Sequence, residues 1–211
     1  IDLGYRGKIK NYLQFDVSAY YLQYGNRIGT VTVSGTPSYR LVTNIGSSIS
    51  KGIESYVEFN AIRAFTKSTH ADVIVFASYG YTHARYSNNH NESSTTEKKV
   101  WYAPEHLLRS GITSGYKNFL STVQVSYAGK TYSDANNTKT PTANGNNGLI
   151  PSYTITDLTA TYKFSKGLNI KAGINNLFNK IYFTRRAGGY PGPGALPADG
   201  RTFFISVGAK L

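Results

Sequence analysis

The segment Gly200–Leu211 reads GRTFFISVGAKL, and its side chains alternate between two kinds. The residues between the apolar positions are small or polar, apart from Phe204. Successive side chains of a β-strand point to opposite faces, so this pattern predicts a strand with one apolar face. The apolar positions are Phe203, Ile205, Val207, Ala209 and Leu211.

The same alternation recurs along the chain, with turn residues between the runs, and helical periodicity is hard to find. The stretch 73–82 is less regular, because Ile74 and Phe76 fall on its polar side. We therefore expect an all-β protein of about nine strands, several of them longer than the usual five or six residues. The expected strands lie near 1–7, 10–28, 40–62, 71–86, 103–116, 119–134, 151–164, 167–186 and 200–211.

The connections between these strands alternate between short and long. In an up-and-down meander, this order places every short turn at one end of the sheet and every long loop at the other. Outer-membrane barrels have this asymmetry, so the pattern predicts a transmembrane antiparallel β-barrel whose apolar face meets lipid. The alternative is an ordinary soluble sheet, which has no reason to sort its loops. The short connections are 8–10, 66–70, 117–118 and 165–167, and the long ones are 29–39, 87–103, 135–150 and 187–200.

An odd number of strands does not close a barrel of this kind, because bacterial single-chain barrels have an even number. The first residues, IDLGYRGKI, already have the character of a strand. We therefore expect residues 1–211 to be one portion of a larger barrel, with no domain boundary inside them.

The composition excludes several functional classes. The net charge is +12, but many cations lie in loop segments and form neither a helix face nor a compact patch, so we expect no nucleic-acid partner. Cysteine is absent, and the four histidines (His70, His83, His90 and His106) lack the spacing of a metal site, so we expect no metal. Glu54 and Glu58 share one strand face and are better explained by a water-filled lumen wall than by a glycosidase pair. We expect no enzymatic activity and no cofactor.

Several stretches resemble the C-terminal end of TonB-dependent outer-membrane receptors. They are GINNLFNKIYFTRR and YPGPGALPADGRTFFISVGAKL, together with APEHLLRSGI, YSDANN and IPSYTITDLTATYKF in the same order. Within the family, the ferric citrate branch is the most similar. The resemblance implies the C-terminal part of a 22-stranded barrel around a plug domain that is absent from this chain. Leu211 departs from the aromatic residue with which the family usually ends. Asn175 and Asn176 interrupt the alternation and predict a β-bulge.

The resemblance also implies a function. The whole protein would import a ferric chelate, a siderophore or ferric citrate, across the outer membrane of a Gram-negative bacterium. Its expected partners are the chelate, outer-membrane lipid and lipopolysaccharide, and TonB–ExbB–ExbD through the missing N-terminal region. The alternatives are TonB-dependent import of haem, cobalamin or oligosaccharide, a passive porin, or a soluble all-β lectin.

The candidate ligand-binding residues are arginines, because a guanidinium is always charged and binds carboxylate or phosphate through two hydrogen bonds. Four of them lie near the long-loop end of their strands, and Arg109 lies further down its strand. The alternative for each is a solvated or lipopolysaccharide-facing rim cation. The candidates are Arg85, Arg109, Arg185, Arg186 and Arg201.

Overall fold

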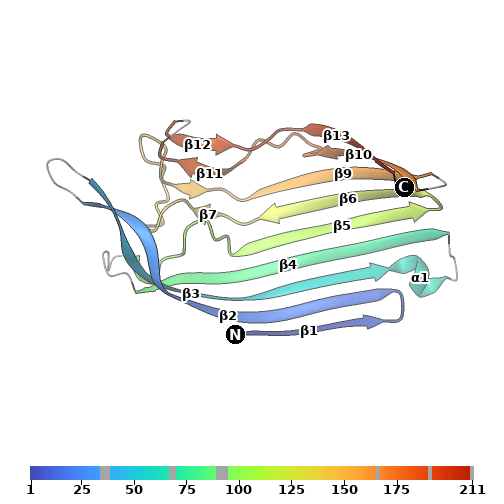
Figure 1. The fold of residues 1–211 in the computed structure, drawn as a ribbon, viewed down its shortest axis with the longest axis horizontal. Helices are drawn as coiled ribbons and strands as arrows, with labels where there is room; N and C mark the ends of the chain where they lie inside the picture. The colour runs from blue at the N-terminus through green and yellow to red at the C-terminus, as the bar shows by residue number, and fades with distance from the viewer. Residues whose placement is uncertain (34–38, 67–69, 89–94, 165–166, 190–191, 210–211) are drawn as a thin grey trace.

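The computed structural model describes residues 1–33, 39–66, 70–88, 95–164, 167–189 and 192–209. It contains one long, curved antiparallel sheet whose nine strands are ordered β1-β2-β3-β4-β5-β6-β9-β10-β13 (Figure 1). The bounds are β1 (Asp2–Ile9), β2 (Leu13–Val33), β3 (Tyr39–Asn60), β4 (Ala71–Asn88), β5 (His106–Tyr116), β6 (Phe119–Ala128), β9 (Tyr153–Lys163), β10 (Leu168–Asn175) and β13 (Thr202–Ala209).

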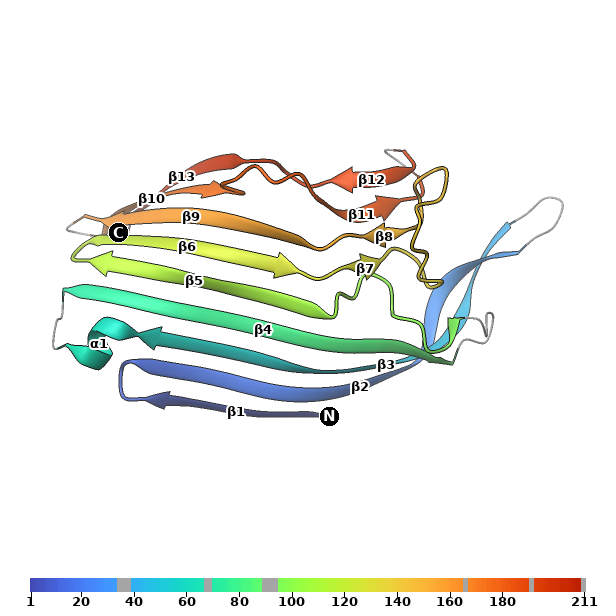
Figure 2. The ribbon, with the colours of Figure 1, turned by 180° about the vertical axis from the view of Figure 1, so that it is seen from behind.

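The remaining elements lie at the two ends of this sheet (Figure 2). Two small hairpins, β7–β8 and β11–β12, and the projecting outer parts of strands β2 and β3 lie at one end, which we call the long-loop end. The tight turns and a short helix lie at the other, the short-turn end. In the described ranges, no helix is long and apolar enough to cross a membrane. The bounds are α1 (Ala61–Phe65), β7 (Thr131–Tyr132), β8 (Leu149–Ile150), β11 (Phe183–Ala187) and β12 (Gly194–Pro197).

The sheet confirms the predicted meander, because its nine strands lie side by side in the order in which they occur along the chain. The turn at 117–118 joins β5 to β6 directly, with Lys117 at φ +52°. Between β6 and β9 and between β10 and β13, the chain leaves the sheet and forms the small hairpins. Parts of several predicted features lie outside the described residues. They include His90, residues 67–69 of the predicted connection 66–70, residues 165–166 of the predicted connection 165–167, and Leu211.

Several predicted boundaries are wrong. Residues 29–33 are not a loop but continue β2, because their Thr-Val alternation pairs with β3 as far as Val33–Tyr39. The strand predicted over 40–62 ends at Asn60, whose side chain caps helix α1 by accepting a hydrogen bond from the Arg63 backbone N–H. The strands predicted over 103–116 and 119–134 are shorter, because β5 begins at His106 and β6 ends at Ala128.

The strand predicted over 167–186 is interrupted, and the predicted bulge is absent. The pairing of β10 with both neighbours runs without a register shift to its last residues. Asn176 then adopts a left-handed conformation (φ +51°), which ends the strand. The break in the alternation therefore marks a strand end, and the chain re-enters a sheet only at β11.

One face of the sheet carries a band of apolar side chains across most of its strands, and we call it the apolar face. Directly paired residues share a face, so the register defines an apolar row across seven strands. Val75, Ile112 and Phe203 in this row are 46%, 50% and 71% exposed. The row is Phe59–Val75–Ile112–Val123–Leu158–Ile174–Phe203.

This exposure fits a membrane barrel and not a soluble sandwich. Among the described residues, the buried apolar side chains are few: Ala84, Tyr86, Ala128 and Ile150. A soluble sheet buries its apolar face in a core, whereas a barrel wall leaves it outside for lipid. Val207 lies on this face and Ser206 on the opposite one, as the alternation predicts.

The opposite face, which we call the polar face, carries polar side chains and a few large rings. The rings lie over glycines on neighbouring strands. A Cβ atom on Gly173 would clash with the Phe204 ring, and one on Gly111 would lie 2.6 Å from the Phe76 ring. Phe204, the exception in the final strand, and Phe76, on the polar side of β4, therefore each fill the space that a glycine leaves.

Candidate functional site

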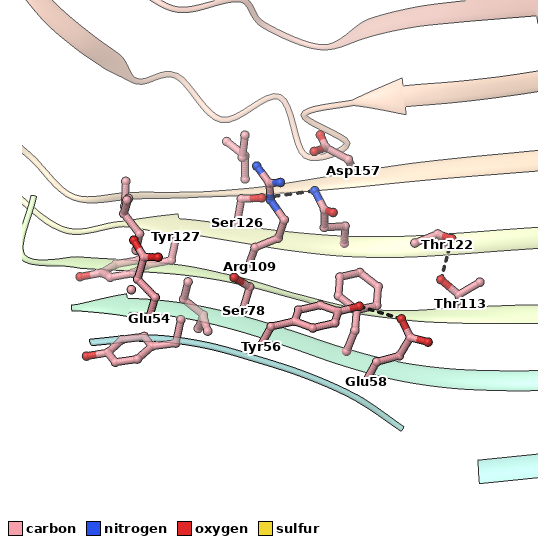
Figure 3. Close-up of a pocket in the computed structure, with 18 of the residues that line it drawn as sticks. Glu54, Tyr56, Glu58, Ser78, Arg109, Thr113, Thr122, Ser126, Tyr127 and Asp157 are labelled. Atoms are coloured by element: carbon pink, nitrogen blue, oxygen red, sulfur yellow. Dashed lines mark hydrogen bonds between the residues drawn. The ribbon is translucent and has the colours of Figure 1, made fainter. Parts of the chain in front are cut away.

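The polar face forms an open recess of about 1010 Å³ (Figure 3). Five neighbouring strands, β3, β4, β5, β6 and β9, supply its lining. Because alternate residues of each strand share a face, the register places a polar row across the recess. That row is Tyr56–Ser78–Arg109–Ser126, and a second row beside it carries Glu58, Gln124 and Asp157.

Several groups in the recess are joined by hydrogen bonds. The Tyr56 hydroxyl donates to Glu58 Oε2 at 2.6 Å, and the Thr113 and Thr122 hydroxyls are 2.8 Å apart. Arg109 is exposed in the recess and takes part in none of the ion pairs found among the described residues. A solvent-accessible guanidinium is therefore presented by a wall that also carries carboxylates.

At the long-loop end, three connections are joined into one layer, which we call the loop layer. The Tyr102 hydroxyl donates to the Arg186 carbonyl oxygen at 3.1 Å. Asn137 binds Lys99 in both directions, with its side-chain oxygen accepting from the Lys99 N–H and its amide donating to the Lys99 carbonyl, both at 2.8 Å. The loops that contain residues 99–102, 134–149 and 183–187 therefore support one another.

Arg186 is part of this layer. Its guanidinium donates to the carbonyl oxygens of Gly145 at 2.9 Å and Leu149 at 3.2 Å, and it lies 5.0 Å from the centre of the Phe183 ring. Both hydrogen bonds go to the loop between β7 and β8 and its end, so Arg186 supports the loop layer from within. Its neighbour Arg185 is exposed.

Arg85 occupies a different environment. It lies on the apolar face by register, since it pairs with Ile49, and its guanidinium binds Glu105 at 3.0 Å. Lys99 binds the same carboxylate at 2.5 Å. Burial alone would raise the pKa of Glu105, but the hydrogen bonds and charges of Lys99 and Arg85 outweigh it and hold that pKa below its ordinary value.

The structure therefore does not bring the five predicted arginines into one cluster. Arg109 lies in the recess, Arg85 lies on the apolar face, and Arg186 lies within the loop layer. Arg185 and Arg201 are exposed, and the backbone N–H of Arg201 donates to Asn179 Oδ1 at 2.9 Å. Among the described residues, no group of three or more His, Asp or Glu side chains is arranged to hold a metal ion.

Asn176 makes structural contacts that its sequence pattern does not predict. It is 3% exposed, and its backbone N–H donates to Asp157 Oδ1 at 2.8 Å. Its side-chain amide donates to the carbonyl of Lys180, and its side-chain oxygen accepts from the Lys180 N–H. It thereby fixes the end of β10 to the recess wall and to the segment that leads into β11. In the sequence, this position is marked only by the Asn175–Asn176 pair of the NNLF stretch, which interrupts the alternation.

Comparison with known proteins places this geometry in a family. Residues 1–177 match the family model described as TonB dependent receptor-like, beta-barrel. A probable TonB-dependent siderophore receptor, PiuA, of Acinetobacter baumannii is 34% identical over 84 residues, which is 40% of this chain. A ferric enterobactin receptor of Pseudomonas aeruginosa is 42% identical over 78 residues, or 33% of this chain. The matched segments span 10% of the length of each of these relatives.

Solved structures show the same fold over almost all of this chain. The ferric citrate transporter FecA in its unliganded form superposes with a TM-score of 0.81 at 21% identity, covering 99% of this chain and 30% of that one. The copper transporter OprC superposes with a TM-score of 0.74 at 19% identity and covers the same shares. At these identities, the likeness concerns the fold alone.

Proposed function

Because the chain belongs to the TonB-dependent receptor-like β-barrel family of the Gram-negative outer membrane, we propose that it forms the C-terminal part of the barrel of a ferric-chelate importer. In this proposal, residues 1–211 supply nine strands of a 22-stranded barrel. The remaining strands, the plug domain and the segment that contacts TonB–ExbB–ExbD come from other parts of the protein. The whole protein would be a transporter and not an enzyme.

The cargo class is supported by charge. The chain carries 23 Lys and Arg residues against 11 Asp and Glu, a net charge of +12. An excess of positive charge on a protein attracts anionic ligands over a long range and speeds their association. Two relatives carry names that specify a siderophore and ferric enterobactin. An anionic ferric chelate, whether a siderophore or ferric citrate, satisfies both observations.

The observation that carries the proposal is the position of Arg109. Its guanidinium is exposed inside the recess and has no carboxylate partner in the described ion pairs. In the proposed mechanism, Arg185 and Arg201 attract the chelate at the long-loop end, and the loop layer held by Arg186 gives it a defined surface. Arg109 then binds the anion deeper in the lumen, before the plug rearranges. No covalent step is needed.

The test is uptake by cells that produce the complete receptor. Radiolabelled ferric citrate and ferric enterobactin are supplied separately, with and without functional TonB. We expect TonB-dependent accumulation of one of them. Equal uptake without TonB would indicate a passive porin. TonB-dependent uptake of only haem, cobalamin, an oligosaccharide or copper would overturn the assignment to a ferric chelate.

A further inference from the structure

The apolar face carries a ring-rich zone near the long-loop end. Tyr81 pairs directly with His106, and their ring centres are 5.3 Å apart. Tyr79 stacks on the same imidazole, and its hydroxyl lies 2.8 Å from His106 Nδ1. Amphipathic rings of this kind mark the boundary between the hydrocarbon layer and the headgroups.

The apolar residues of β4 span the hydrocarbon layer of the membrane below this zone. On the apolar face of β4, Val73, Val75 and Ala77 precede Tyr79 and Tyr81. The stretch 73–81 has the length, about 9–11 residues, that a tilted strand needs to cross a bilayer. Residues beyond Tyr81 on the same face therefore stand at the depth of the outer-leaflet headgroups.

Cations occupy this headgroup depth. Two residues beyond Tyr81, His83 pairs with Lys51, and two further on Arg85 pairs with Lys99 through an isolated bridge. The register and the ion pairs to Glu105 therefore gather Lys51, His83, Arg85, Lys99 and Glu105 into one cluster. Arg85 and Lys99 both pair with the Glu105 carboxylate, and Lys51 adds a third permanent cation. Lys51 is exposed and forms none of the described ion pairs.

We propose that Lys51, His83, Arg85 and Lys99 form a site for the anionic phosphorylated headgroup of an outer-leaflet lipid. The cluster lies on the lipid-facing side of the wall, so a chelate in the lumen does not reach it. Its excess positive charge stands directly above the aromatic zone, where a lipid phosphate would lie while the acyl chains cover Val75 and Ala77. Arg85 thus binds the lipid headgroup and not the imported chelate. This inference rests on the family's membrane orientation and not on the identity of the cargo.

The experiment measures lipid binding to the complete receptor in nanodiscs. The probes are bis-phosphorylated lipid A and its dephosphorylated form, each diluted in phosphatidylethanolamine. The test variant is Lys51→Gln with Lys99→Gln. The control is Lys130→Gln with Lys139→Gln, which removes the same charge from exposed positions in a loop at the same end of the sheet. We expect the test variant to lose roughly fivefold in affinity per lysine for the phosphorylated probe, and the control to bind as the parent does.

The other outcomes overturn the proposal. Equal retention of phosphorylated and dephosphorylated lipid, or equal losses in both variants, would mean that the cations are solvated rim charges. Displacement of the lipid by inorganic phosphate at millimolar concentration would indicate a site for a soluble anion. Heat-modifiable migration verifies that each variant is assembled. Ferric-chelate binding is measured in parallel for Lys51→Gln alone, which leaves the loop layer unchanged, and should equal that of the parent, which separates failure of this inference from failure of the proposed function.

Discussion

The hydroxyl of Tyr102 donates a 3.1 Å hydrogen bond to the carbonyl oxygen of Arg186, which lies 84 positions later in the sequence. The backbone N–H of Arg186 donates back to the same hydroxyl at 3.4 Å. This pair connects the segment before β5 to strand β11. Together with the Asn137–Lys99 bonds, it makes three long connections into a single layer at the long-loop end.

Replacing Tyr102 by Phe should loosen this layer without affecting the barrel wall. The change removes a hydroxyl with two partners, at a cost of about 1 kcal/mol. We expect faster amide hydrogen exchange in residues 98–102 and 183–187 of the complete receptor, with unchanged protection in β4 and β5. Tyr116→Phe, at the short-turn end, is the matched control. Uniform exchange changes along the chain would contradict a local role.

Gly52 should not tolerate a side chain. A Cβ atom there would clash with the Tyr81 carbonyl oxygen and lie 2.7 Å from the Tyr20 hydroxyl oxygen. We expect Gly52→Ala to destabilise the receptor by roughly 1–3 kcal/mol, measured as a lower temperature of the heat-modifiability transition. Gly80→Ala is the control, because its nearest neighbour would be Leu107 Cβ at 4.0 Å. Equal transitions for the two variants would disprove the close approach at Gly52.

The facing of β13 predicts an asymmetry between two adjacent residues. Val207 pairs with Ile170 on the apolar face, and Ser206 pairs with Lys171 on the polar face. An arginine at mid-bilayer depth costs about 2–4 kcal/mol on the lipid side and far less in the lumen. Val207→Arg should therefore reduce the amount of assembled receptor much more than Ser206→Arg. The reverse order would place the strand one residue out of register.

Acid should weaken the contacts around Glu105. Its pKa in the folded protein is lowered by Lys99 and Arg85, so its ion pairs contribute stability that is fully present above the unfolded pKa. That stability is lost as the pH falls through the lower, folded-state pKa. Proteolysis between residues 98 and 105 should therefore increase on acidification below the ordinary carboxyl range. The Glu105→Gln variant should be cleaved at a rate that no longer depends on pH, and parental pH dependence in that variant would argue against this role.

Much of the sheet could be predicted because its signal is local. Alternation assigns Val207 to the apolar face and Ser206 to the polar face from neighbouring residues alone. The errors arise where one local pattern permits two structures. The stretch 29–33 has alternating Thr and Val but begins with Gly29, and only its pairing with β3 shows that it is a strand. Asn176 ends a strand because its left-handed backbone is held by Asp157 and Lys180.

The candidate site was less predictable, because its contacts join residues far apart in the sequence. The sequence identifies arginines as anion ligands but does not say which face each one occupies after folding. Arg109 falls in the recess because it is in register with Ser78 and Ser126. Arg186 is occupied by the carbonyls of Gly145 and Leu149, which belong to another loop. No pattern within a single strand encodes these contacts.

The most direct test of the proposed function is a titration of the complete receptor, with Arg109 and Arg185 each replaced by Gln. Ferric citrate and ferric enterobactin are the probes, at low and high salt. Lys171→Gln is the control, because Lys171 is on the polar face outside the recess. A charge-assisted contact is worth roughly 1.5–3 kcal/mol, so we predict at least a tenfold loss of affinity for Arg109→Gln. We predict a smaller, salt-sensitive loss for Arg185→Gln and no loss for Lys171→Gln. Unchanged affinity in the assembled Arg109→Gln receptor at both salts would contradict the account.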